Sequence, residues 1–70
     1  MKRELIKDYY GKILGSIETD TSGNKIAKDY FGLILGFYDK KSDTTQDKLR
    51  RIIARGDSVV SLIFQHVAKK

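Results

Sequence analysis

The chain has 70 residues, no cysteine, a single histidine and a formal net charge of +5. This length fits one small domain, residues 1–70, and the composition excludes disulfides, thiolate metal sites and the usual ligand set of a structural zinc ion. Because small chains without such supports commonly self-associate, we expect a homodimer or larger homo-oligomer.

The N-terminal segment "MKRELIKDYY" is charged and has no apolar core, so it does not predict a signal peptide. Elsewhere, no stretch approaches the ~20 apolar residues that a membrane-spanning helix needs. Together with the missing cysteines, these features predict a soluble cytoplasmic protein that makes no membrane contact.

Two segments, residues 7–18 and 28–39, nearly repeat each other, with seven of twelve positions identical. A fainter third copy follows at 46–57, where Arg50 replaces the first glycine of the unit. The intervening "TDTSGNK" and "DKKSDTT" are rich in residues that favour turns. A unit of about 20 residues is too short for a helix pair but accommodates two strands and a turn. The pattern therefore predicts a mainly β fold, a small antiparallel meander of repeated β-hairpins. In its Tyr, Gly and Asp pattern the unit resembles short hairpin repeats of bacterial surface proteins, without their tryptophans, and no activity is carried over.

The glycines of each unit are four residues apart, as in helices that pack through small residues, and they decide between two folds. In a helix, Gly32 and Gly36 would each destabilise by roughly 1 kcal/mol relative to alanine. In a hairpin, Gly11 and Gly32 supply the positive φ of a turn, while Gly15 and Gly36 mark a bulge or a close backbone approach. The hairpin interpretation accounts for all four positions.

Strict alternation along the second strand of each unit predicts which side chains share a face. In the first unit, one face is predicted to hold Ile13, Gly15 and Ile17, and the opposite face Leu14, Ser16 and Glu18. In the second unit, one face is predicted to hold Leu33, Leu35 and Phe37, and the opposite face Ile34, Gly36 and Tyr38. A strand that is apolar on both faces needs a covering layer from the same chain or from a second subunit.

The tail, residues 58–68, is expected to supply such a layer as a short C-terminal helix. Val60, Ile63, Phe64 and Val67 follow the spacing of one helix face, with Asp57 or Ser58 as the N-cap and Lys69 and Lys70 at the C-terminal end. The many β-branched residues leave a strand as the alternative. We expect self-association to involve both this helix face and the strand that is apolar on both faces. The residues expected in the contact are Leu33, Leu35, Phe37, Ile63 and Phe64.

Chemistry-bearing residues are few, and each has a structural interpretation. His66 has no companion at a catalytic spacing, and the recurring Asp8, Asp29 and Asp47 are expected to accept hydrogen bonds in turns. The "RGD" at 55–57 is interpreted as a turn into the tail, and no phosphate-binding or dinucleotide-binding motif occurs. We therefore expect no enzymatic activity, no catalytic, metal or cofactor site, and no small-molecule substrate.

The function predicted from the sequence is that of a small, non-enzymatic protein-interaction module that self-associates through its β-sheet. The alternative is binding of nucleic acid or of an acidic protein partner by the basic C-terminal third, through Lys48, Arg50, Arg51 and Arg55. The aromatic residues are expected to fill the core, where they could not stack on the bases of a nucleic acid. They are Tyr9, Tyr10, Tyr30, Phe31, Phe37 and Tyr38.

Overall fold

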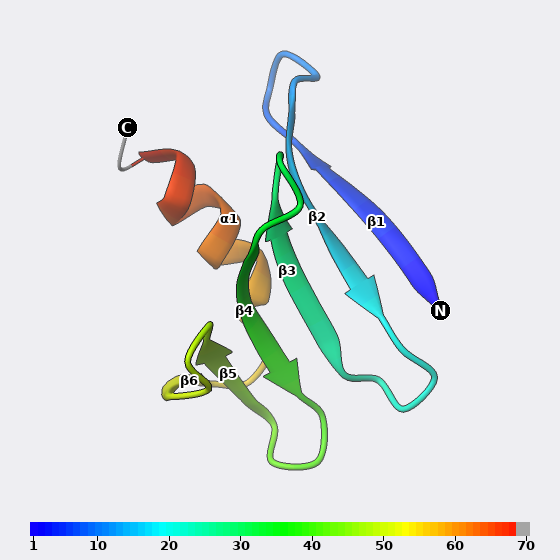
Figure 1. Cartoon of the computed structure of the whole chain (residues 1–70), viewed down its shortest axis with the longest axis vertical. Coiled ribbons are helices and arrows are strands. Elements are labelled where there is room, and N and C mark those ends of the chain that lie inside the picture. Colours follow the sequence, from blue (N-terminus) through cyan, green and yellow to red (C-terminus); the bar gives the residue numbers. More distant parts are fainter. Residues whose placement is uncertain (69–70) are drawn as a thin grey trace.

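The computed structural model describes residues 1–68 of the chain. It contains six strands and one helix: β1 (Lys2–Lys7), β2 (Ile13–Thr19), β3 (Lys25–Asp29), β4 (Ile34–Asp39), β5 (Thr44–Asp47), β6 (Ile52–Arg55) and α1 (Val59–Ala68). The strands form a single antiparallel sheet in chain order, and α1 lies against β2, β3 and β4 (Figure 1). The predicted hairpin meander with a C-terminal helix is confirmed.

Four of the turns between strands are closed by the same arrangement around an aspartate. In the turn at residues 8–12, Asp8 Oδ1 accepts hydrogen bonds from the amides of Tyr10 and Lys12 at 2.8 and 2.9 Å. The Asp8 amide also donates to the Lys12 carbonyl oxygen, at 2.9 Å. The same bonds recur in the turns at 20–24, 29–33 and 47–51. The predicted turn role of Asp8, Asp29 and Asp47 is thus confirmed, and Asp20 adds a fourth case.

The fourth residue of every one of these turns has a positive φ. Glycine occupies it in three turns, with φ of 83° at Gly11, 90° at Gly23 and 87° at Gly32. In the third repeat Arg50 takes this conformation, with φ of 68°. Its guanidinium carbon lies 3.7 Å from the centroid of the Phe37 ring, a cation–π contact that stabilises a conformation unfavourable for a residue with a Cβ. The third copy is therefore a true structural repeat.

A β-bulge follows the turn in each repeat, and it changes the predicted faces. Ile6 pairs with Gly15 but Lys7 pairs with Ile13, so that Leu14 is an extra residue in β2. Leu35 is the extra residue in β4, and Ile53 in β6. The prediction of strict alternation is wrong here, because the extra residue of a bulge places its side chain on the same face of the sheet as the residue that follows it. Leu14 and Leu35 consequently join Gly15 and Gly36 on the face that α1 covers.

The helix crosses the sheet where the two strand glycines leave room for it. A Cβ built on Gly15 would lie 3.2 Å from Ile63 Cγ2 and would collide with the Lys28 carbonyl oxygen. A Cβ on Gly36 would collide with Leu62 Cδ1. The predicted close approach is confirmed at both positions. The core between helix and sheet consists of Leu14, Ile17, Ala27, Tyr38, Val59 and Ile63, with Ile6, Leu35 and Leu62 packed against it.

The rotation of α1 about its axis differs from the prediction. Val59 and Ile63 are buried, and Leu62 packs against the core from the same side. The predicted inward stripe of Val60, Ile63, Phe64 and Val67 is therefore wrong for three of its members, since Val60, Phe64 and Val67 are exposed, whereas Ile63 is buried as predicted. Asp57 assists at the helix start as expected, accepting a hydrogen bond from the Val59 amide at 3.3 Å. Lys69 and Lys70 lie outside the described residues.

We predict that Gly32→Val lowers the free energy of unfolding by about 1–2 kcal/mol, the strain of a left-handed conformation on a residue with a Cβ. A Cβ at Gly32 meets no atom within 4 Å, so the loss isolates backbone strain from steric collision. Urea denaturation measures it, with Gly32→Asn as the control because asparagine tolerates this conformation. An unchanged unfolding midpoint in Gly32→Val would contradict the turn geometry.

Candidate functional site at the turn end of the sheet

Aromatic side chains crowd one end of the sheet. In an antiparallel meander, the turns at 8–12, 29–33 and 47–51 lie at the same end, which we call the turn end (Figure 1). The second and third residues of the first two turns are rings exposed to 94% (Tyr9), 88% (Tyr10), 65% (Tyr30) and 76% (Phe31). Each pair is packed edge to face, with centroids 5.4 Å apart. The prediction that these rings fill the core is wrong; only Tyr38 is buried there.

A comparison within the chain shows that the turn geometry does not require these rings. The turn at 20–24 makes the same hydrogen bonds, but its second and third residues are Thr21 and Ser22. That turn lies at the opposite end of the sheet. Exposure of four rings at one end, where small polar residues suffice at the other, indicates a contact surface. Sequence reasoning missed this, although the shared D-x-x-G pattern of the turns was available to reveal it.

The net positive charge of residues 1–68 is also at the turn end. The turns with one flanking residue on each side, residues 7–13, 28–34 and 46–52, carry six basic and three acidic residues. The other described residues carry equal numbers of basic and acidic side chains. Each of the three carboxylates is also committed to turn amides. The turn end is thus both aromatic and cationic.

Between the two aromatic turns and the C-terminal end of α1 lies a groove of about 570 Å³, which we call the tip groove. Its apolar wall comes from Ile13, Leu14 and Val67, and Tyr30 and Phe31 border it. The polar groups that line it are Lys12, Asp29 and His66. The volume lies in the range of small-ligand sites, and aromatic borders with a few polar groups are typical of such sites.

His66 and Asp29 face each other at the tip groove. His66 Nε2 lies 3.6 Å from Asp29 Oδ2, and the Asp29 side chain is only 5% exposed. Asp29 Oδ1 accepts the turn amides of Phe31 and Leu33. The carboxylate is therefore positioned by the turn, while its second oxygen faces the imidazole. Sequence spacing alone does not bring these residues together.

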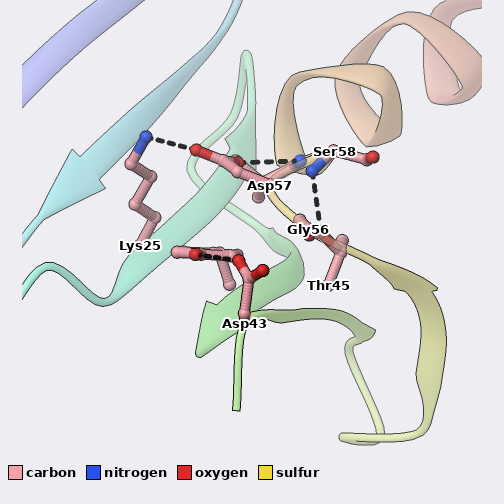
Figure 2. Close-up of polar contacts among 8 residues, drawn as sticks. Lys25, Asp43, Thr45, Gly56, Asp57 and Ser58 are labelled. Carbon is pink, nitrogen blue, oxygen red and sulfur yellow. Dashed lines mark hydrogen bonds and ion pairs between the residues drawn. The ribbon is translucent and has the colours of Figure 1, made fainter. Parts of the chain in front are cut away.

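A second polar cluster, at the opposite end of α1, anchors the helix to the sheet (Figure 2). Lys25 Nζ lies 2.5 Å from Asp57 Oδ2, and Thr45 Oγ1 accepts a hydrogen bond from the Ser58 amide while donating to the Gly56 carbonyl oxygen. The Asp57 carboxylate is thus engaged by Lys25 and by the start of the helix. Gly56 and Asp57 form the bend that leads from β6 towards α1, as expected from the sequence.

Tyr38 adds a titratable group near this anchor. Its hydroxyl donates to Asp43 Oδ1 at 2.5 Å, and this hydrogen bond, together with burial, raises the pKa of Tyr38 to about 12. Because the folded pKa lies above the ordinary value of 10.0, the stabilisation is complete below pH 10 and is lost as the pH rises through about 12.

We therefore predict that the stability of the wild-type chain falls between pH 10 and about 12 more steeply than that of Tyr38→Phe, which has no hydroxyl to ionise. Urea midpoints measured at intervals across this range test it. The matched control is Tyr30→Phe, which removes an exposed hydroxyl. Its stability should fall with pH as steeply as that of the wild type. Parallel curves for wild type and Tyr38→Phe would contradict this role of the hydrogen bond.

The four basic residues singled out from the sequence do not form one patch. Lys48, Arg50 and Arg51 lie in the turn at 47–51, whereas Arg55 ends β6 at the other end of that strand. Arg50 stacks on Phe37, and Arg51 Nε donates to Asp47 Oδ2 at 2.8 Å. The Arg51 amide, and then its guanidinium and the Leu49 amide, lower the pKa of Asp47. Two of the four cations are therefore already engaged within the chain.

The five residues expected in self-association are also dispersed. Ile63 is 0% exposed in the core, and Leu35 packs against that core. Phe37 lies on the opposite sheet face, between Gly36 and Tyr38, under Arg50. Leu33 is exposed at the turn end and Phe64 on the outer side of α1. Of the five, Leu33 and Phe64 are accessible for contact with another molecule.

Within residues 1–68, no three His, Cys, Asp or Glu side chains are grouped closely enough to hold a metal ion. The only helix of that region, α1, has ten residues and is too short to cross a bilayer. Comparison with protein-family models, with curated proteins and with solved structures found no match to this chain.

Proposed function

We propose that the protein is a small, non-enzymatic interaction module that forms a homo-oligomer in the cytoplasm. The contact between copies is made by the outer helix face, which we define as Val60, Phe64 and Val67. The outer helix face takes the place of the five dispersed residues that the sequence predicted for self-association. Phe64 belongs to both sets and lies at the centre of this face.

The observation that carries the proposal is the rotation of α1. Two overlapping stripes of the helix have the same i, i+3, i+4, i+7 spacing, one beginning at Val59 and the other at Val60. The stripe that faces the sheet ends in the polar His66, whereas the stripe beginning at Val60 is entirely apolar and has three members exposed. A surface helix normally places polar residues outward, so an outward apolar stripe indicates a further contact.

The occupant that this face fits best is a second copy of the chain. Apart from His66, α1 contains no ionisable side chain, so two copies can meet across a two-fold axis without opposing like charges. The sheet is covered on one face by this single helix, and few apolar residues are fully buried. The small core of a chain of this size supplies limited stability. Burying apolar surface against a second copy adds to that stability.

We predict that Phe64→Glu shifts the protein from an oligomer to a monomer of 8.0 kDa, because it places a carboxylate at the centre of an apolar contact. Sedimentation equilibrium over a range of protein concentrations measures the shift. Thr21→Glu introduces the same charge at an exposed turn residue remote from α1 and should leave the mass unchanged. A wild-type chain that remains an 8.0 kDa monomer at high concentration would refute self-association.

A further inference from the structure

We infer that the turn end is a binding site for single-stranded nucleic acid, with unpaired bases stacking on the exposed rings and one base entering the tip groove. This function is centred on the aromatic turns and does not depend on self-association; of the outer helix face, only Val67 also lines the tip groove. It also differs from the expected contact through the basic C-terminal third, because its centre is the pair of aromatic turns.

The rings are presented in a way that suits successive bases. Tyr9 and Tyr10 occupy one turn, and Tyr30 and Phe31 occupy the next turn at the same end. Neighbouring turns at one end are two strand spacings apart, or about 10 Å. The aspartate hydrogen bonds fix the backbone of each turn, so little backbone freedom remains to be lost on binding. Aromatic platforms of this kind bind single strands with little sequence preference.

The tip groove adds groups that complement a nucleotide. Tyr30 and Phe31 border it with aromatic surface for a base, and the Lys12 ammonium offers a partner for a phosphate. The half-exposed His66 imidazole, which lies 3.6 Å from the buried Asp29 carboxylate, offers a hydrogen-bonding group for a base edge. The groove therefore combines stacking, hydrogen-bonding and cationic groups in one place.

Charge favours the same ligand. Lys7, Lys12 and Lys48 are exposed beside the three turns, and within residues 1–68 none of them forms an ion pair. The net positive charge of the turn end attracts a polyanion that follows the row of turns. Rings that protrude in this way stack on unpaired bases but not on the closed base pairs of a duplex.

A membrane surface is a less suitable partner for this arrangement. The tip groove is lined by Lys12 as well as by the aromatic turns. Taking its ammonium group into the apolar part of a bilayer is unfavourable.

The test replaces an aromatic turn by the polar turn that the chain already uses. Tyr30→Thr combined with Phe31→Ser copies the second and third residues of the turn at 20–24, so the fold should be preserved. Fluorescence anisotropy with a labelled oligothymidylate of about 16 nucleotides should show binding weakened by roughly tenfold or more. Thr21→Ala combined with Ser22→Ala, in the opposite turn, should bind as the wild type does.

A second variant tests the charge separately. Lys12→Ala should reduce the slope of log affinity against log salt concentration by about 0.7, the effect of losing one phosphate contact. Wild-type binding of a duplex with the same length should be weaker than binding of the single strand. Circular dichroism and sedimentation of each variant separate loss of this site from loss of fold or of self-association.

Three outcomes would overturn the inference. The first is no binding of the single strand by the folded wild type even at low salt. The second is binding that the Tyr30→Thr, Phe31→Ser variant retains in full, which would indicate charge attraction alone. The third is binding of phosphatidylserine vesicles, but not of oligonucleotides, through the same rings, which would assign the turn end to a membrane surface.

Discussion

The structure depends on one repeated interaction, an aspartate carboxylate that accepts two backbone amides of its own turn. At Asp8, Asp20, Asp29 and Asp47 the acceptor distances are all 2.8–2.9 Å. These bonds fix four hairpins locally, without help from a large core. The sheet packs against a single helix, and it can form because each of its strand pairings joins strands that are consecutive in the sequence.

Sequence reasoning succeeded where the physics is local. Aspartate followed three residues later by glycine specifies a turn through its hydrogen bonds and its positive φ, and both were expected at Asp29 and Gly32. The third repeat was harder to recognise, because Arg50 hides the glycine position behind a charged side chain. Its conformation becomes understandable only with Phe37 in view, a contact that spans two strands of the sheet.

Sequence reasoning failed where the answer depends on distant neighbours. Strict alternation put Leu14 and Leu35 on the wrong faces, because a bulge is defined by the partner strand as much as by its own residues. The rotation of α1 was mistaken for a similar reason. Apolarity favours the stripe beginning at Val60, but the gaps over Gly15 and Gly36 admit Leu62 beside Ile63, so the stripe beginning at Val59 faces the sheet. The rings of the turn end were overlooked separately, since they were counted as core.

The turn motif places constrained and exposed side chains at different positions. Its first and fourth positions are constrained by hydrogen bonding and by φ, whereas the side chains at its second and third positions are exposed. At residues 21–22 these exposed positions hold small polar residues, and at 9–10 and 30–31 they hold rings. The turns at 8–12, 20–24 and 29–33 have the same geometry, so the geometry does not explain the difference. The rings are found in the turns at one end of the sheet and the small polar residues in the turn at the other end. The proposed single-strand site thus lies at one end of the sheet, where the rings, the excess positive charge and the tip groove coincide.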